Sequence, residues 1–246
     1  MNKKLVLALL TVGISLGAVQ AQAACSDISY SALSSAAENV KAASNTGGFG
    51  LNMWVTFVDE TGKVCAVTTT GTKGALASQG EWLGSRVISA QKANTANAFS
   101  LNGVSISTGF LFVLVQPGGS LFGLQESNPV DAGRAYKGDP NNYGKINDPL
   151  VHGRVGGVNV FGGGIAVYKN GAKVGAIGVS GDTSCTDHAF AWKVRDALGL
   201  ASGYPDFDAG GGFERLQLVG SATGLFQHPD CYNTSGITTQ AEFGFK

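Results

Sequence analysis

Histidine, acidic and basic side chains cluster near residue 188, where they could bind a metal ion or exchange protons. His188 follows Asp187 at the expected start of a helix, and imidazole is both a common metal ligand and an acid–base group near neutral pH. Helical spacing places Trp192 and Arg195 near His188, where they would supply an aromatic wall and a positive charge. The alternative is that His188 is a polar residue at a helix start that bonds to a neighbouring loop.

The bend before this helix could hold an anion, because the first backbone N–H groups of a helix have no partner within it. Its residues are Ser180, Gly181, Asp182 and Thr183. Ser184 and Asp187 also match the S-x-x-D capping box. Capping alone explains these residue types, so both an anion site and a plain helix start remain open.

Other candidate positions lie elsewhere in the chain. Lys92 and Thr95 lie on a helix of small residues, where a lysine could bind an anion or carry an exposed or interface charge. His152 lies at the end of a long loop, where it could contact a covered ligand or be merely solvated. His228, in the tail, is a weaker candidate.

Periodic patterns predict an α+β domain around these residues. Two apolar strands within residues 155–188 meet at Asn170-Gly171, a strong hairpin signal. The two hairpins and a strand near Gly157–Phe161 would form a five-stranded antiparallel sheet with helices on one face. The first hairpin is expected over residues 51–58 and 63–70, and helical spacing predicts helices over 29–44, 81–100 and 183–200, with a helical turn or two over 108–115.

The chain ends and one internal segment differ from this core. Residues 1–23 have the charged start, apolar run and small-residue end of a signal peptide. We therefore expect residues 24–246 to be a single domain, exported to the periplasm or outside the cell and not inserted in a membrane. Residues 126–153 form an irregular insertion that could cover a ligand. Residues 203–246 form an irregular tail.

Charge and cysteine content narrow the class of protein. The full chain has 17 basic and 17 acidic residues, and removing Lys3 and Lys4 with the signal peptide leaves 15 against 17. Such a balance argues against nucleic acid as a partner.

Four cysteines in an exported protein favour disulfides. Three pairings are possible; we prefer Cys25–Cys65 and Cys185–Cys231, because each tethers a chain end to a regular element. The alternative is that Cys185, near a helix start, is a reactive thiol.

Three motifs resemble the GlcG/HbpS-like haem-binding family, which includes the C-terminal domain of PduO-type proteins. They are Lys92-Ala93-Asn94-Thr95-Ala96, Gly156-Gly157-Val158-Asn159-Val160 and the strand from Val174 to Gly181. The resemblance covers residues 30–200. It implies a five-stranded antiparallel sheet with about four helices, and a homo-oligomer. Asn159 stands where many members have proline, and the insertion and tail depart from the compact members.

The resemblance implies haem as the ligand. His188 is then the candidate iron ligand, and Arg195 could pair with a propionate. The other candidate contacts are Asp187, Lys92, Thr95, Ser180, Gly181, Asp182, Thr183 and His152. The first hypothesis is a haem- or tetrapyrrole-binding protein for storage, delivery or sensing. The alternatives are an enzyme acting on a small carboxylate or carbonyl compound, and an accessory subunit of a periplasmic redox or sensory system with no ligand of its own. No hydrolase, zinc-peptidase or C-x-x-C motif is present.

Overall fold

Four antiparallel strands form the central sheet. A computed structural model describes residues 25, 28–43, 46–201, 212–218 and 227–231, so the expected signal peptide and much of the tail lie outside the described residues. The sheet has the order β2-β1-β4-β3, with β1 at Trp54–Asp59, β2 at Val64–Thr69, β3 at Gly164–Lys169 and β4 at Ala172–Ser180. Both predicted hairpins are therefore confirmed. Asn170 (φ 53°) and Gly171 (φ 80°) make the second turn, which needs positive φ at both positions.

The fifth strand expected near residues 157–161 is not formed. Gly157 has a φ of 79°, which breaks an extended run. The backbone there bonds instead to side chains of the helix at Leu83–Phe99: Asn94 Nδ2 donates to Gly157 O at 2.9 Å, and Asn159 N donates to Thr95 Oγ1 at 3.0 Å. Side chains of this helix therefore make the hydrogen bonds to the backbone of residues 157 and 159 that a neighbouring strand would otherwise have made.

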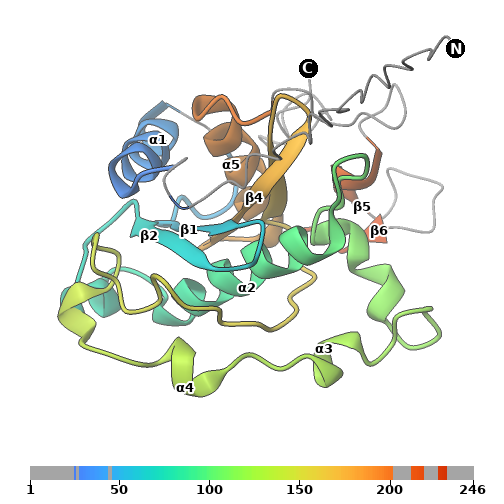
Figure 1. Ribbon diagram of the computed structural model, residues 1–246, viewed down its shortest axis with the longest axis horizontal. Helices are drawn as coiled ribbons and strands as arrows, with labels where there is room; N and C mark the ends of the chain where they lie inside the picture. Colours follow the sequence, from blue (N-terminus) through green and yellow to red (C-terminus); the bar gives the residue numbers. More distant parts are fainter. Residues whose placement is uncertain (1–24, 26–27, 44–45, 202–211, 219–226, 232–246) are drawn as a thin grey trace, which may run out of the picture.

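Helices cover both faces of the sheet, so the expectation of helices on one face is wrong. Helices α1 (Tyr30–Ala43) and α5 (Ser184–Ala197) pack on one face, and α2 (Leu83–Phe99) packs on the other (Figure 1). All six residues of β1 are buried. A strand buried on both faces reads as a continuous apolar run and does not reveal how many helix layers cover it.

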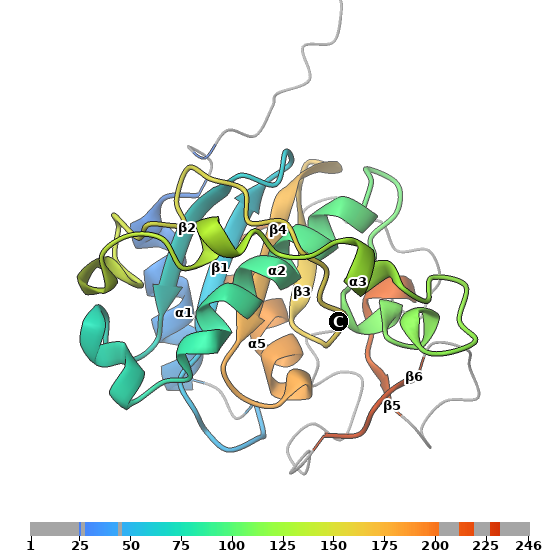
Figure 2. The same ribbon diagram turned by 90° about the horizontal axis from the view of Figure 1, so that it is seen from below.

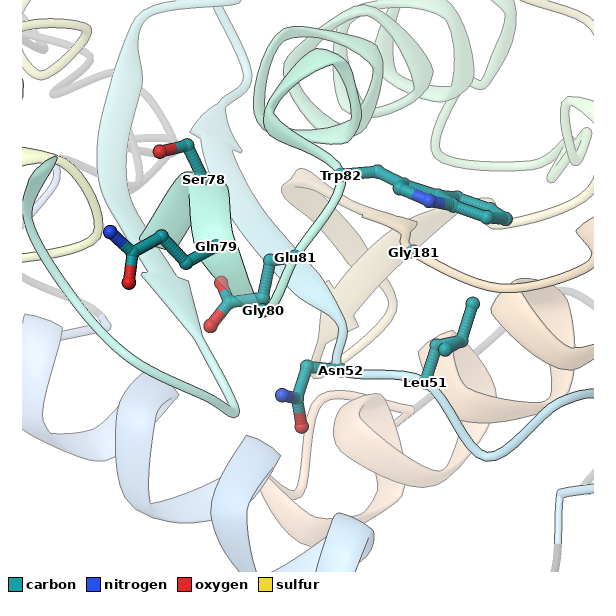
Figure 3. A pocket seen from close by; sticks show the side chains of 8 residues that line it. All are labelled: Leu51, Asn52, Ser78, Gln79, Gly80, Glu81, Trp82 and Gly181. Carbon is teal, nitrogen blue, oxygen red and sulfur yellow. The ribbon is translucent and has the colours of Figure 1, made fainter. Parts of the chain in front are cut away.

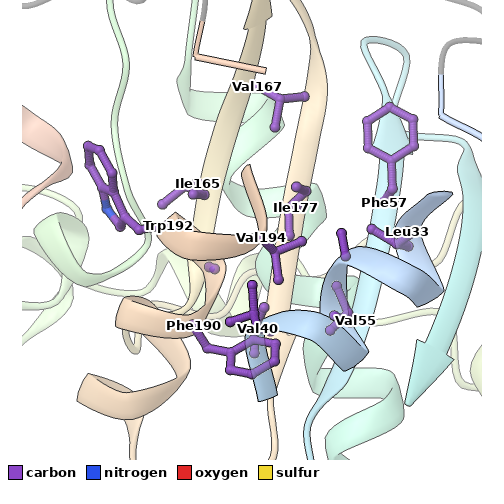
Figure 4. Close-up of a cluster of buried hydrophobic side chains, with 14 of the residues drawn as sticks. Leu33, Val40, Val55, Phe57, Ile165, Val167, Ile177, Phe190, Trp192 and Val194 are labelled. Atoms are coloured by element: carbon purple, nitrogen blue, oxygen red, sulfur yellow. The ribbon is translucent and has the colours of Figure 1, made fainter. Parts of the chain in front are cut away.

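The larger core lies between the sheet and the helices α1 and α5 (Figure 4). Leu33 and Val40 of α1 and Phe190 and Val194 of α5 pack there against side chains from three strands. Those strand side chains are Val55, Phe57, Ile165, Val167 and Ile177. Burial of each large side chain of this kind stabilises the fold by about 1.5–3 kcal/mol.

Small residues let α2 approach the other face closely. Ala90, Ala93 and Ala96 are fully buried against Trp54 and Val58 of β1. A Cβ on Gly178 of β4 would lie 1.9 Å from the carbonyl oxygen of Ser89. The small-residue pattern of this helix therefore serves a close helix–sheet contact.

The insertion covers the outer face of α2 (Figures 1 and 2). It begins within the one-turn helix α3 (Leu124–Ser127) and contains the one-turn helix α4 (Ala132–Ala135) and a 3₁₀ turn at Pro140–Asn142. Arg86 of α2 anchors it through a buried ion pair with Asp148. The segment lies on the side of the sheet opposite α5, away from His188.

Short elements complete the described chain. The expected helical turns near residue 110 are the 3₁₀ turns Gly109–Leu111 and Val113–Val115, and another 3₁₀ turn spans Ala75–Gln79. In the C-terminal region, the 3₁₀ turn Gly212–Glu214 precedes the parallel pair β5 (Gln217–Leu218) and β6 (Gln227–His228). Among the described residues, no helix is long and apolar enough to cross a membrane.

The close contact at Gly178 predicts a large cost for Gly178→Ala. The added methyl group would collide with backbone that cannot move freely, so we expect the free energy of unfolding to fall by about 3 kcal/mol. Gly84→Ala is the matched control, because no atom lies within 4 Å of a Cβ there. Urea unfolding should show no loss of stability for the control. Equal stability of the two variants would contradict the close packing of α2 on β4.

Candidate functional site

Three consecutive glycines carry the chain between α2 and α5 into β3. A Cβ on Gly163 (φ 122°) would lie 3.0 Å from Lys92 Nζ and 3.0 Å from the Cβ of Asp187. A Cβ on Gly162 would lie 2.6 Å from a backbone oxygen of α5, and one on Gly164 would lie 2.5 Å from a backbone oxygen of α2. The missing side chains therefore let groups from the two helix layers meet at this end of the sheet.

The groups that meet there are Lys92 of α2 and Asp187 of α5. Lys92 Nζ donates to Asp187 Oδ2 at 2.8 Å and to Val179 O at 3.0 Å. Asp187 Oδ1 accepts a hydrogen bond from Asp182 N at 3.0 Å. Both residues are 2% exposed, so Lys92 is not a surface charge. Burial raises the pKa of Asp187 to about 6, although Lys92 favours the charged carboxylate.

His188 lies next to this pair and is fully buried. Trp192 Nε1 donates to its Nε2 at 3.1 Å, and Gly163 N lies 3.4 Å from its Nδ1. A neutral imidazole carries a proton on one ring nitrogen, so only one of the two accepts a hydrogen bond. Burial lowers the pKa of His188 to about 3, with smaller contributions from His228 and from positive charge on Arg195. The imidazole is therefore neutral at physiological pH, and it could meet an iron only after these contacts break.

Arg195 is also buried and already has a carboxylate partner. Its Nη1 donates to Glu214 Oε2 at 2.8 Å and to Ala166 O at 2.9 Å. The guanidinium lies 4.0 Å from the centre of the Trp192 ring. Trp192 and Arg195 do lie beside His188, as helical spacing predicts, but Glu214 occupies the place foreseen for a propionate.

Glu214 belongs to the C-terminal cover, the described residues 212–218 and 227–231, which packs on the His188 region. The disulfide Cys185–Cys231 ties it to the first turn of α5, and Gly162 N donates to His228 Nε2 at 3.2 Å. The structure also contains the other preferred disulfide, Cys25–Cys65. Cys185 is thus paired and is not a free thiol. Glu214 and His228 of the C-terminal cover lie close to the buried His188.

In the bend before α5, a backbone N–H group donates a hydrogen bond to a carboxylate of the protein itself. Asp182 N donates to Asp187, and the Asp182 carboxylate accepts hydrogen bonds from Phe49 N and Leu51 N at 2.9 Å each. Ser180 is buried, and a Cβ on Gly181 would lie 2.2 Å from a backbone oxygen. This arrangement fixes the loop at residues 47–51 to the start of α5.

The cap of α5 differs from the capping box that the sequence suggested. Thr183 is the N-cap, and its Oγ1 accepts from Thr186 N at 3.3 Å. Ser184 is already the first helical residue, and the Asp187 side chain points to Lys92. The predicted box is wrong because Thr183, one residue before Ser184, caps the helix, while Asp187 divides its two oxygens between Lys92 and the backbone N–H of Asp182.

The two remaining candidates lie apart from His188. Thr95 Oγ1 donates to Gln91 O at 2.8 Å and accepts from Asn159 N, so it anchors the chain before β3. His152 is exposed, has a φ of 66°, and donates its backbone N–H to Val64 O at the start of β2. It is the exposed one among the three histidines.

A half-open pocket of about 270 Å³ lies beside Gly181 (Figure 3). Its other lining residues are Leu51, Asn52, Ser78, Gln79, Gly80, Glu81 and Trp82. Sequence patterns pointed to Gly181 but not to Glu81 or Trp82. Their signal, an acidic residue next to an aromatic one before a helix, is too common to stand out alone.

Comparisons with known proteins agree with the motif resemblance. The family model described as "Haem degrading protein HbpS-like" matches residues 28–195. Solved structures that match include the Klebsiella pneumoniae protein ORFY, at 23% identity over 70% of this chain and 90% of that one (TM-score 0.46). A complex of PduOC with haem matches at 22% identity over 70% and 93% (TM-score 0.47). A double mutant of HbpS from Streptomyces reticuli matches at 14% over 80% and 99% (TM-score 0.43). No curated protein matches the chain.

The Lys92–Asp187 pair predicts a strong effect of Lys92→Met. The substitution leaves Asp187 buried without its cation, so we expect the free energy of unfolding to fall by about 3–5 kcal/mol. Lys137→Met, at an exposed position, should change it by less than about 0.5 kcal/mol. The double variant Lys92→Met/Asp187→Asn should recover part of the loss. Urea unfolding measures all three, and a Lys92→Met variant as stable as the control would refute the structural role.

The two buried histidines predict a loss of stability in mild acid. Burial lowers the pKa of His188 to about 3 and that of His228 to about 4, whereas both titrate near 6.5 in the unfolded chain. The unfolded chain therefore binds more protons below pH 6.5, and stability falls as the pH falls towards 4. Asp187 acts in the opposite direction, because its raised pKa lets the folded state bind a proton near pH 6.

His228→Gln isolates the histidine contribution from that of Asp187. Between pH 6 and 4.5 the slope of unfolding free energy against pH should be shallower in this variant, by up to about 1.4 kcal/mol per pH unit. Urea unfolding at a series of pH values measures the slope. Identical slopes for His228→Gln and the unchanged protein would contradict a neutral buried His228.

Proposed function

The chain belongs to the HbpS-like family of haem degrading proteins, and on this basis we propose that it is an exported protein that binds haem or a related tetrapyrrole. The observation that carries the proposal is the family match over residues 28–195, which spans both hairpins, α1, α2 and all but the last two residues of α5. Haem storage, delivery or sensing are the roles that such binding would serve.

The proposed iron ligand is a histidine, and accessibility separates the candidates. His152 is exposed in the described conformation, whereas His188 is fully buried beside the C-terminal cover. Ligation by His188 requires the C-terminal cover to move away and the contacts with Gly163 and Trp192 to break. The other candidate contacts around His188, including Lys92 and Arg195, become available to a ligand only under the same condition.

Export and self-association complete the proposal. Two disulfides in the described chain fit an oxidising compartment, as the signal-peptide pattern of residues 1–23 predicts. The disulfide Cys185–Cys231 would keep the C-terminal cover in place there. We further propose that the protein acts as a homo-oligomer, as the family resemblance implies.

Haem degradation is the second candidate function, favoured by the family description itself. It would make the protein an enzyme. The same haemin titration, followed over time with and without a reductant, separates the two: a binding protein keeps its Soret band, whereas a degrading enzyme loses it.

Titration of the purified protein with haemin tests the main proposal. We expect a Soret shift that saturates at a fixed stoichiometry. A titration without saturation would remove the proposal. His152→Ala should weaken binding if the exposed histidine is the ligand, and His188→Ala should weaken it if the C-terminal cover opens.

The double variant Cys185→Ser/Cys231→Ser distinguishes the two sites further. Releasing the C-terminal cover should strengthen haemin binding at His188 and leave binding at His152 unchanged. His152→Ala is the matched histidine control for the His188 site, since His152 is exposed and lies outside the C-terminal cover. Thermal unfolding of each variant shows whether the fold is retained.

A further inference from the structure

The pocket beside Gly181 is built from residues that the haem proposal does not use. In Figure 3, Leu51 and Trp82 line one side, and Ser78 and Gln79 line the other. Three segments line the pocket: the chain before β1, the chain after β4 and the chain before α2. At about 270 Å³ it lies near the lower limit for sites of small molecules. It suits a compact ligand.

Glu81 supplies an unpaired carboxylate oxygen at this pocket. Glu81 is only 8% exposed, and its Oε2 accepts a hydrogen bond from Thr69 Oγ1 at 2.6 Å. Its Oε1 is buried and makes no geometric hydrogen bond among the described residues, although the backbone N–H of Thr72 lies close enough to favour the charged carboxyl. A buried polar atom without a partner costs free energy, and burial raises the pKa of this carboxyl. A donor from a ligand would relieve that cost.

A glycine makes room for this carboxylate. A Cβ on Gly71 would lie 2.2 Å from Glu81 Oε1 and 2.4 Å from Asn52 Nδ2. Any other residue at position 71 would push both polar groups aside. Gly71 thus leaves the space in which the side chains of Glu81 and Asn52, from two parts of the chain, come close together.

The charge and the aromatic ring of the pocket lining indicate which kind of ligand fits. Glu81 is the charged residue among the eight that line the pocket. The nearby Lys73 is paired with Glu38 at 3.0 Å. Trp82 is 58% exposed, and an indole face attracts cations. Negative charge and an open aromatic ring at one pocket favour a small organic cation.

We propose that this pocket binds a small organic cation with N–H groups, a primary ammonium or a guanidinium, through the Glu81 carboxylate and the Trp82 ring. The N–H group donates to the carboxylate. The terminal torsion of a glutamate side chain is broad, so a small rotation presents the unpaired oxygen to the pocket. The alkyl part of the cation packs against Leu51.

Calorimetric titration with n-butylamine at pH 7 tests the proposal, with 1-butanol as the neutral ligand of the same shape. We expect saturable binding of the amine and none of the alcohol. Glu81→Gln should weaken amine binding by about tenfold or more, because a hydrogen bond to a charged group is lost. Glu126→Gln, which removes an exposed charge outside the lining, should leave binding unchanged.

Trp82→Ala provides a second variant in case Glu81→Gln fails to fold. Its side chain is largely exposed, so the fold should tolerate the change, and amine binding should weaken. Absence of saturable amine binding, equal binding of 1-butanol, or unchanged affinity in a folded Glu81→Gln variant would overturn the proposal. Haemin titration of the same variants is independent of these outcomes.

Discussion

The ion pair between Lys92 and Asp187 joins the two helix layers around one end of the sheet. Moving two charges out of water costs several kcal/mol for each ion. The structure offsets this cost with Val179 O, which accepts from the lysine, and Asp182 N, which donates to the carboxylate. Because α2 and α5 lie on opposite faces, the pair can form only where β3 begins, and the glycines there leave the necessary space.

The residue types best suited to chemistry therefore hold the fold together. Asp182 fixes the loop at residues 47–51, Arg195 binds Glu214, and His188 lies between Gly163 and Trp192. Each buried polar group needs such partners, because an unpaired one destabilises the folded state. Glu81 differs, since one of its carboxylate oxygens has no geometric partner among the described residues and the residue lines a pocket; Glu60 Oε2 and Trp54 Nε1 also lack a partner but do not line it. Unsatisfied bonding capacity is a better guide to a site than residue type alone.

The insertion and the C-terminal cover are attached in the same way, one to α2 and the other to α5. Arg86 of α2 binds Asp148 of the insertion, and its guanidinium lies 3.8 Å from the centre of the Tyr143 ring. Arg195 of α5 binds Glu214, and its guanidinium lies 4.0 Å from the centre of the Trp192 ring. In each case a planar cation pairs with a carboxylate and stacks on an aromatic ring. Both segments depart from the compact family pattern, and each covers a helix that would otherwise face solvent.

The sequence by itself determined the local elements. Helical spacing located α1, α2 and α5, Asn170-Gly171 located the second hairpin, and the preferred cysteine pairs are the ones present. Only the tertiary structure decided that residues 157–161 bond to α2, that helices cover both faces of the sheet, and that His188 is buried while Glu81 lines a pocket. Helices and turns depend on torsions and hydrogen bonds within a few residues of each other. Burial and pairing of a polar side chain depend on segments far away in the chain, such as Glu214 beside Arg195, and no local pattern encodes them.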